Sequence, residues 1–209
     1  MSLCLTSVGI IYRRPGESAP LDDVKKLVRR SQKGDAVAFE QLVTLYQDRI
    51  YGLTYHLTGN HADAQDLAQD AFVKAYYALK GFRNEADFGT WLHRITVNVW
   101  INVKRKQRPV VSLDEPISTG DGEVQRELEA TSEGPEEAAE RREFQELVQA
   151  ALQEISAEHR TVLVLRELQG YTYEEIAEIL DCSLGTVKSR INRARQALKE
   201  KLASLPERN

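Results

Sequence analysis

The chain has 209 residues, of which 42% are hydrophobic and 29% are charged, and its formal net charge is −4. This composition is typical of a soluble globular protein and argues against wholesale disorder. No apolar run approaches the roughly 20 residues that span a bilayer, and the first 20 residues place their charges after the apolar stretch, unlike a signal peptide. We therefore expect a cytoplasmic protein. Cys4 and Cys182 have no CxxC or Cys/His spacing, which argues against zinc or a disulfide framework.

The negative charge is concentrated in one segment. From Ser112 to Glu146, twelve acidic residues outnumber three basic ones, so this segment carries −9 and the rest of the chain +5. The segment also holds two prolines and three glycines, and it has no long apolar period before Phe144. We interpret it as a solvated linker between two compact halves. The acidic average therefore does not exclude nucleic-acid binding by either half.

Before the linker, apolar residues recur at helical spacing from Val24 to Leu79 and predict a helical bundle. Asp35 is a predicted helix N-cap, and residues 58–60, Thr-Gly-Asn, are a predicted helix stop. The segment Ile95–Val103 alternates apolar and polar residues as a half-buried strand would. The same region also carries an apolar stripe at spacings of three and four, beginning at Phe88, and the neighbouring helices offer no sheet to join. We favour a helix over a strand here.

After the linker, periodicity predicts four more helices, over residues 144–155, 162–168, 173–180 and 187–202. Thr172 and Glu175 have the spacing of a capping box at the start of the third. A short capped helix, a tight turn and a second amphipathic helix form a helix-turn-helix pattern. The predicted fold class is all-α, with two small helical domains joined by an acidic flexible linker and the second a helix-turn-helix domain.

The last predicted helix is strongly cationic. Basic residues interleave with its apolar stripe, and no acid appears until Glu200. Such a face in a major groove would neutralise phosphates, while residues near the helix start would reach base edges. The residues placed for base contact are Thr186, Lys188, Ser189 and Asn192. A solvated basic helix is the alternative interpretation.

Three aspartates in the first half, Asp63, Asp66 and Asp70, share one helix face with Gln65 and Gln69. Like charges at this spacing repel by a few tenths of a kcal/mol per pair, about 0.2–0.5, and a basic partner would offset this repulsion. We interpret the face as a protein-docking surface. The alternative, acids favoured by the helix macrodipole, fits Asp63 better than Asp70. No His, Lys or metal-spaced partner adjoins the carboxylates, so neither catalysis nor a metal or cofactor is expected.

A third group combines aromatic and basic side chains. Rings can stack on unstacked bases while cations follow the phosphates, which suits single-stranded nucleic acid. The alternative is that most of these rings belong to the core. The group contains Tyr76, Tyr77, Phe82, Arg83, Phe88, Trp91, Arg94, Trp100 and the run of residues 104–108, Lys-Arg-Lys-Gln-Arg.

These segments resemble extracytoplasmic-function (ECF) RNA polymerase sigma factors. Residues 63–76, DAQDLAQDAFVKAY, look like the family's core-polymerase-binding motif. Residues 88–95, FGTWLHRI, with Asn98, look like the helix that opens and reads the minus-10 element. Residues 185–195, GTVKSRINRAR, are similar to the minus-35 recognition helix. The three motifs occur in the family's order, with the expected linker, and cover most of residues 22–202.

The resemblance implies a division into an N-terminal extension (1–21), a polymerase-binding and minus-10 domain (22–110), an acidic linker (111–142) and a minus-35 domain (143–205). It assigns contact with the polymerase clamp helices to Asp63, Gln65, Asp66, Gln69 and Asp70. It places a flipped minus-10 base in the loop 84–88, with the DNA-binding residues Asn84, Phe88, Trp91, Arg94, Asn98, Lys104 and Arg105. It assigns minus-35 contact to Thr186, Lys188, Ser189, Arg190, Asn192, Arg193 and Arg195.

The resemblance further implies three partners, namely core RNA polymerase, promoter DNA and an anti-sigma protein. We expect the acidic linker to lie along basic protein surface of the polymerase. A stand-alone helix-turn-helix regulator is the main alternative, and it would bind its duplex alone as a dimer. An enzyme is a third alternative, but the sequence lacks a nucleophile, phosphate loop or metal constellation. Residues 1–20 have no expected role beyond a flexible tail, and Cys182 is expected to be a packing thiol rather than a redox group.

Overall fold

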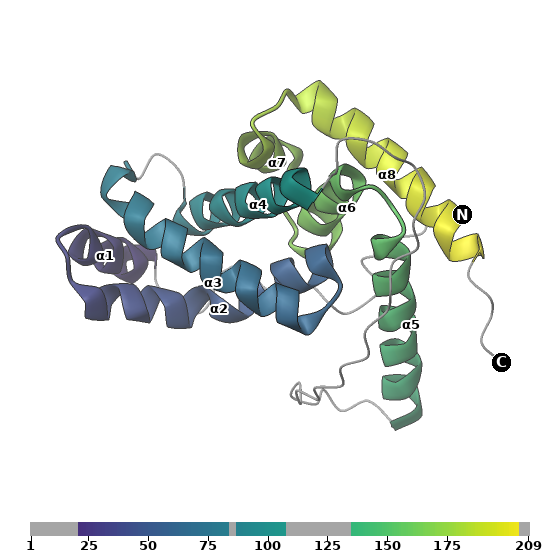
Figure 1. Ribbon diagram of the computed structural model, residues 1–209, viewed down its shortest axis with the longest axis horizontal. Helices are drawn as coiled ribbons and strands as arrows, with labels where there is room; N and C mark the ends of the chain where they lie inside the picture. Colours follow the sequence, from purple (N-terminus) through teal and green to yellow (C-terminus); the bar gives the residue numbers. More distant parts are fainter. Residues whose placement is uncertain (1–20, 84–86, 108–134, 205–209) are drawn as a thin grey trace.

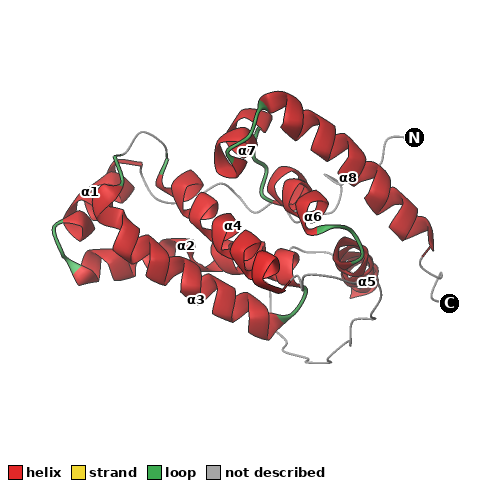
Figure 2. Ribbon diagram, turned by 45° about the horizontal axis from the view of Figure 1, so that its top comes forward, coloured by secondary structure: helices red, strands yellow, loops and turns green. Residues whose placement is uncertain are grey.

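The computed structural model describes residues 21–83, 87–107 and 135–204, and regular structure within these ranges is helical. The two modules, coloured purple to teal and green to yellow, lie side by side along the long axis (Figure 1), and helices build both of them (Figure 2). The all-α fold class is confirmed. The first module contains α1 (Leu21–Gln32), α2 (Ala36–Thr58), α3 (His61–Ala78), the 3-10 turn η2 (Leu79–Gly81) and α4 (Phe88–Gln107). The second contains α5 (Pro135–Gln153), α6 (Ala157–Leu163), the π-helical η3 (Val164–Leu168), α7 (Tyr173–Leu180) and α8 (Leu184–Ser204).

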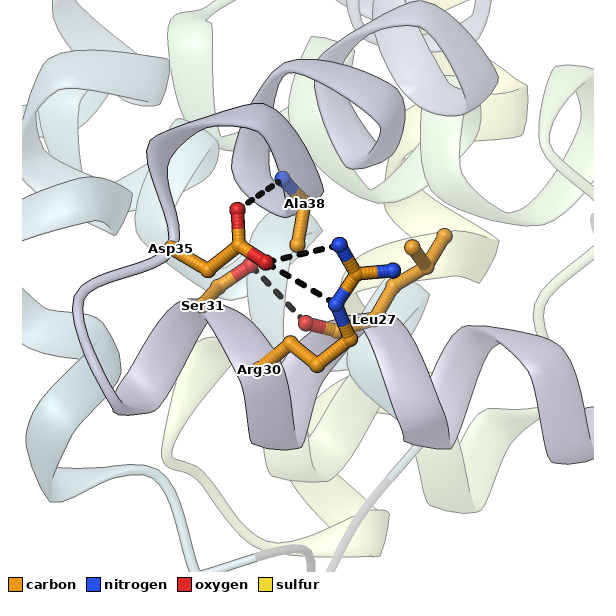
Figure 3. A network of polar contacts seen from close by, with 5 residues as sticks. All are labelled: Leu27, Arg30, Ser31, Asp35 and Ala38. Carbon is orange, nitrogen blue, oxygen red and sulfur yellow. Dashed lines mark hydrogen bonds and ion pairs between the residues drawn. The ribbon is translucent and has the colours of Figure 1, made fainter.

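The turn between α1 and α2 is held by the predicted N-cap. The Asp35 carboxylate accepts a hydrogen bond from the Ala38 backbone N–H at 3.0 Å and forms an ion pair with Arg30 Nη2 at 2.7 Å (Figure 3). These two donors hold the pKa of Asp35 below its ordinary value, with the Ala38 bond the larger cause. The Ser31 hydroxyl donates back to the Leu27 carbonyl at 2.8 Å. The turn is therefore held by contacts between residues no more than five positions apart in the sequence.

The predicted stop of α2 is also confirmed. Gly59 has a φ of 86°, in the left-handed region, and its N–H donates to the Tyr55 carbonyl at 2.8 Å. Asn60 then caps α3, because its side-chain oxygen accepts from the Asp63 N–H at 2.8 Å. A left-handed glycine followed by a capping asparagine lets the chain reverse within two residues.

The segment Ile95–Val103 is helical, as favoured over a strand. The alternation in its sequence arises because α4 is covered on two sides: it packs against α2 and α3 within its own module and against α6 and α7 of the second module. Val97 and Val99 are both buried although they lie on different faces of the helix. The hydroxyl of Thr96, the residue before Val97, donates to the Leu92 carbonyl at 2.9 Å, so this buried polar group has a partner.

The second module follows the predicted caps with one difference in length. Thr172 and Glu175 form both bonds of the capping box at the start of α7, at 3.2 and 2.7 Å. The helix α5, however, begins at Pro135 and not at Phe144. Its added first turns are exposed at residues 139, 140, 142 and 143, so they carry no apolar stripe to reveal them. Proline at the first helical position and strong helix formers such as Ala, Glu and Arg favour this extension.

The two modules share one hydrophobic core. Leu57, Val97 and Trp100 of the first module belong to the same buried cluster as Leu163 and Ile176 of the second. A separate cluster within the first module joins α1, α2, α3, η2 and α4. The two compact halves expected from the sequence are therefore packed against each other. We call the contact between them the seam.

Hydrogen bonds across the seam cap the C-terminus of α2. The last four carbonyls of a helix have no partner within it. Here the Tyr55 and His56 carbonyls accept from the Gln149 and Gln153 amides, each at 3.3 Å, and the Leu57 carbonyl accepts from Arg160 Nη1 at 2.6 Å. The second module thus supplies the C-terminal cap of a helix in the first.

Substituting Gly59→Ala tests this junction. A Cβ at Gly59 would meet the Gln153 side chain, and a left-handed φ costs an alanine about 1–2 kcal/mol. We expect a lower melting temperature and a free energy of unfolding reduced by at least that amount. The control is Gly81→Ala, since a Cβ there has nothing within 4 Å. Equal destabilisation by both substitutions would contradict the role given to Gly59.

Candidate protein and nucleic-acid interfaces

The acidic face of α3 is fully presented to solvent. The side chains of Asp63, Gln65, Asp66, Gln69 and Asp70 are all exposed on this helix. Asp63 is engaged locally, because its carboxylate accepts from the Asn60 amide at 2.7 Å. The carboxylates of Asp66 and Asp70 have no hydrogen bond or ion pair within the described residues. The macrodipole alternative therefore accounts for Asp63 but leaves two charged groups without a structural role.

A shallow apolar groove lies beside this face, between α2 and α3. Its volume is about 470 Å³, and Gln69 of the acidic face forms part of its wall. Tyr77 is 78% exposed and Val73 49%, so the groove and its rim present a patch of apolar surface to solvent. The groove is lined by Phe39, Val43, Gln47, Gln69, Phe72, Val73, Tyr76 and Tyr77. Sequence reasoning missed the α2 residues, because Phe39 and Val43 belong to the apolar stripe of the helix yet are only half-buried.

The aromatic residues of the third sequence group separate into two sets. Phe82, Phe88 and Trp100 are buried, as the core alternative proposed, whereas Tyr76 and Tyr77 are exposed on the groove. Trp91 is half-buried, with its ring 4.8 Å from that of Phe82 and 5.5 Å from that of Phe88. Phe88 therefore supports the start of α4 from inside, and its side chain does not face solvent. Asn84 lies outside the described residues.

The outer face of α4 carries the remaining minus-10 candidates. Arg94, Asn98 and Arg105 are exposed and recur at helical spacing, so they form one polar stripe. Lys104 is half-buried, with its ammonium 4.7 Å from the centre of the Trp100 ring. Burial lowers the pKa of Lys104, and the nearby Arg160 charge adds to this. The stripe stays open to solvent although the opposite side of α4 lies in the seam.

The cationic face of α8 is also confirmed as solvent-exposed. Lys188, Ser189, Asn192 and Arg193 are exposed, whereas Thr186 and Arg190 are half-buried. At the helix start, the Ser183 hydroxyl accepts from the Thr186 N–H at 3.1 Å and so caps α8. The remaining member of the set, Arg195, donates to the Glu167 carboxylate at 2.6 Å.

The helix α7, the turn after it and α8 form a helix-turn-helix. α7 and α8 pack against each other through Ile176, Ile179, Val187 and Ile191, which are buried. The left-handed Asp181, with a φ of 50°, ends α7 and starts the turn. The basic residues of α8 then lie on the side away from the core. No described helix combines the length and the apolar content needed to cross a bilayer.

Comparison with known families identifies both modules. Residues 42–110 match Sigma-70 region 2, and residues 145–198 match Sigma-70 region 4. The RNA polymerase sigma-H factor of Pseudomonas aeruginosa is 42% identical over 185 residues, which cover 87% of this chain and 94% of that protein. The ECF RNA polymerase sigma factor SigW of Bacillus subtilis is 37% identical over 183 residues, covering 87% and 98% of the two chains.

Solved structures share the fold. CnrH, in complex with the cytosolic domain of CnrY, matches with a TM-score of 0.62 at 24% identity, over 88% of this chain and all of that one. The sigma factor RpoE of Bartonella quintana, in complex with the anti-sigma factor NepR, matches with a TM-score of 0.57 at 25% identity, over 80% and 98% of the two chains. The two regions, the full-length relatives and the shared fold show that this chain belongs to the ECF RNA polymerase sigma factor family.

Proposed function

We propose that this sigma factor binds core RNA polymerase through the acidic face of α3 and the adjoining α2–α3 groove. Asp66 and Asp70 offer exposed charges, and the groove beside them offers apolar surface. A helical partner with basic and apolar side chains, such as the polymerase clamp helices, fits both features. The observation that carries the proposal is the position of unpaired carboxylates next to an exposed apolar groove on one helix pair.

We infer that α4 reads and opens the minus-10 element. The Arg94, Asn98 and Arg105 stripe supplies cations and a base-reading amide, and Trp91 at its start has a partly exposed ring. Flipping a base costs a few kcal/mol of stacking, which ring and edge contacts can recover. Asn84 belongs to the proposed base-capturing loop and lies outside the described residues, whereas the buried Phe88 would act by packing against Trp91 at the start of α4.

The second module is proposed to hold the minus-35 duplex through α8. Lys188 and Arg193 would neutralise phosphates, and Thr186, Ser189 and Asn192 lie in the first turns, where a recognition helix meets base edges. Arg190 and Arg195 complete the cationic face. The Glu167 carboxylate holds Arg195 in place, so this guanidinium is already oriented before DNA arrives.

Membership of the sigma factor family also supports proposals about the location, domain boundaries and partners of this chain. The chain would work in the cytoplasm as a non-enzymatic initiation subunit, with domain boundaries at residues 22–110 and 143–205 and an acidic linker between them. An anti-sigma partner is proposed because the related RpoE was solved in complex with NepR. A stand-alone regulator is not favoured, since the chain matches two sigma regions and not a helix-turn-helix alone.

Removing two charges from α3 tests polymerase binding. Asp66→Asn with Asp70→Asn keeps side-chain size but removes the attraction to a basic partner. We expect roughly tenfold weaker binding to core polymerase, or about 1.4 kcal/mol. Glu158→Gln with Glu178→Gln removes two exposed carboxylates from the second module as a control. Unchanged affinity in the α3 variant, measured by fluorescence anisotropy, would reject the proposed docking face.

A pair of asparagines on α4 tests minus-10 reading. Asn98→Ala should slow promoter melting about tenfold, because a base-edge contact contributes about 1–3 kcal/mol. The exposed Asn102 lies one turn further along the same helix, and Asn102→Ala serves as the matched control. Permanganate reactivity of unpaired thymines reports melting. Equal rates for the two variants would count against the assignment.

Lys188→Ala and Arg193→Ala test the minus-35 contact. Each should reduce transcription from intact promoters. Each should also lower the slope of log binding constant against log salt concentration by about one, because one phosphate contact is lost. Neither should change transcription from promoters whose minus-35 element is scrambled. Lys199→Ala, later on the same helix, is the control. Equal losses on intact and scrambled promoters would mean that these residues do not act through the minus-35 element.

A further inference from the structure

Two of the chain's four histidines are buried in the seam. His93 of α4 is fully buried, and its Nδ1 donates to the Gly89 carbonyl at 2.8 Å. The centre of its ring lies 5.2 Å from that of Tyr171, which belongs to the second module. His56, near the end of α2, is 9% exposed, and its Nδ1 is 2.8 Å from the Gln149 Oε1 atom on α5. Each imidazole is therefore covered in part by the other module.

Burial opposes a positive charge on both rings, and it outweighs the polar contacts with Gly89, Gln169 and Gln149 that favour one. Burial lowers the pKa of His93 to about 3, and the Arg49 charge on α2 lowers it further. Burial likewise lowers the pKa of His56, against a smaller contribution from its bond to Gln149. The described groups facing His93 are the Gly89 carbonyl and the side chains of Arg49, Gln169 and Tyr171; those facing His56 are the side chains of Tyr55 and Gln149.

The nearest carboxylates act on the neighbouring tyrosines. Asp87, just before α4, and Glu175, on α7, raise the pKa of Tyr171, and Glu146, on α5, raises the pKa of Tyr55. Burial is the larger cause of both shifts. Asp87 and Glu146 are exposed, Glu175 accepts from the Thr172 N–H, and none of the three carboxylates is among the groups that shift the pKa of His93 or His56. Charging either histidine would thus place a cation in the closed seam.

The seam also holds polar atoms that lack partners. Within the described residues, four buried side-chain nitrogens have no hydrogen bond, and all four belong to seam residues: His93 Nε2, Trp100 Nε1, Arg160 Nε and Gln169 Nε2. An unsatisfied buried polar atom destabilises the state that buries it, and water would satisfy all four once the modules part. The closed arrangement is therefore opposed from within by its own polar groups.

We propose that the seam is an acid-sensitive latch: it holds the second module on the first while His93 and His56 are neutral, and it releases when they are protonated. Neutral His93 donates its one N–H to the Gly89 carbonyl, so protonation adds a donor at Nε2. Among the described residues the neutral Gln169 side chain is the neighbour there, and its effect on the pKa of His93 is smaller than that of burial. In the open chain, water solvates the same charge.

The sign follows from the direction of the pKa shift. A histidine whose pKa is lowered in the closed form stabilises that form fully above its ordinary pKa of 6.5, and this contribution is lost as pH falls through 6.5 towards the closed-form value. When the pH is about one unit below 6.5, protonation of His93 alone shifts the closed-to-open ratio about tenfold towards the open form. His56 acts in the same direction.

Binding of the complex of chain and core polymerase to a promoter with both elements measures this shift even if the open form is rare, because contact with both elements needs separated modules and apparent affinity scales with the open fraction. This readout rests on the proposed function. For the full chain, the pH ratio is the dissociation constant at pH 7.5 divided by that at pH 5.5. We expect this ratio to be about tenfold larger in the wild type than in His93→Phe. Phenylalanine keeps a ring against Tyr171 but cannot be protonated. His159→Gln, outside the seam, should keep the wild-type ratio.

Arg160→Ala is a second, independent variant. Because it removes the donor to the Leu57 carbonyl, it should open the seam at both pH values, giving tighter binding at pH 7.5 and a reduced pH ratio. Equal pH ratios in the wild type, His93→Phe and Arg160→Ala would overturn the latch. Absence of polymerase binding by the wild type at either pH would instead overturn the proposed function. Far-UV circular dichroism at both pH values separates opening from unfolding.

Discussion

The arrangement of the whole molecule depends on Arg160. Its guanidinium donates to the Leu57 carbonyl at the end of α2, to the Gln153 side chain and backbone of α5, and to the Ile155 carbonyl, while it lies 5.8 Å from the centre of the Trp100 ring on α4. Three helices and the following loop thus meet at one side chain. Burial lowers the pKa of Arg160 to about 10, so it remains charged at neutral pH. A cation at a helix C-terminus is also favoured by the macrodipole.

This junction explains how one short chain can present three functional surfaces at once. The shared core buries the inner sides of α2, α4 and α7, so the acidic face of α3, the stripe on α4 and the basic face of α8 are all left outward. The closed arrangement nevertheless limits what these surfaces can reach. Minus-35 and minus-10 elements lie about 25 base pairs apart, or ~85 Å along B-DNA. In the closed chain α4 packs against α7 and α7 against α8, and packed helices are only about 8–10 Å apart, so simultaneous contact with both elements requires the modules to separate.

Local chemistry made much of the fold predictable. The Asp35 cap, the Gly59 stop and the Thr172–Glu175 capping box each depend on residues within five positions of one another, and each appears in the structure as expected. The exposure of the α3 carboxylates and of the α8 basic residues followed from helical periodicity in the same way. The prediction was incomplete for α5, whose early turns are exposed and therefore have no apolar pattern.

The seam could not be predicted, because its contacts join residues far apart in the chain. Arg160 and Leu57 are 103 positions apart, and Arg49 and Gln169 are 120 positions apart. No periodicity marks such pairs, and the acidic segment between the halves gives no sign that they touch. The apolar residues on two faces of α4 were the one available signal. They suggested a strand by alternation, although they reflect burial by helices of both modules.

The central claim is that the two modules pack together in the free chain and separate when it binds its promoter with polymerase. Spin labels at Lys33 and Lys199, both exposed, would report the distance between the modules once Cys4 and Cys182 are replaced. Pulsed dipolar spectroscopy should give one narrow distance population for the chain alone and a population at longer distance in the complex of chain, core polymerase and promoter DNA. The same distance distribution in both samples would contradict the account.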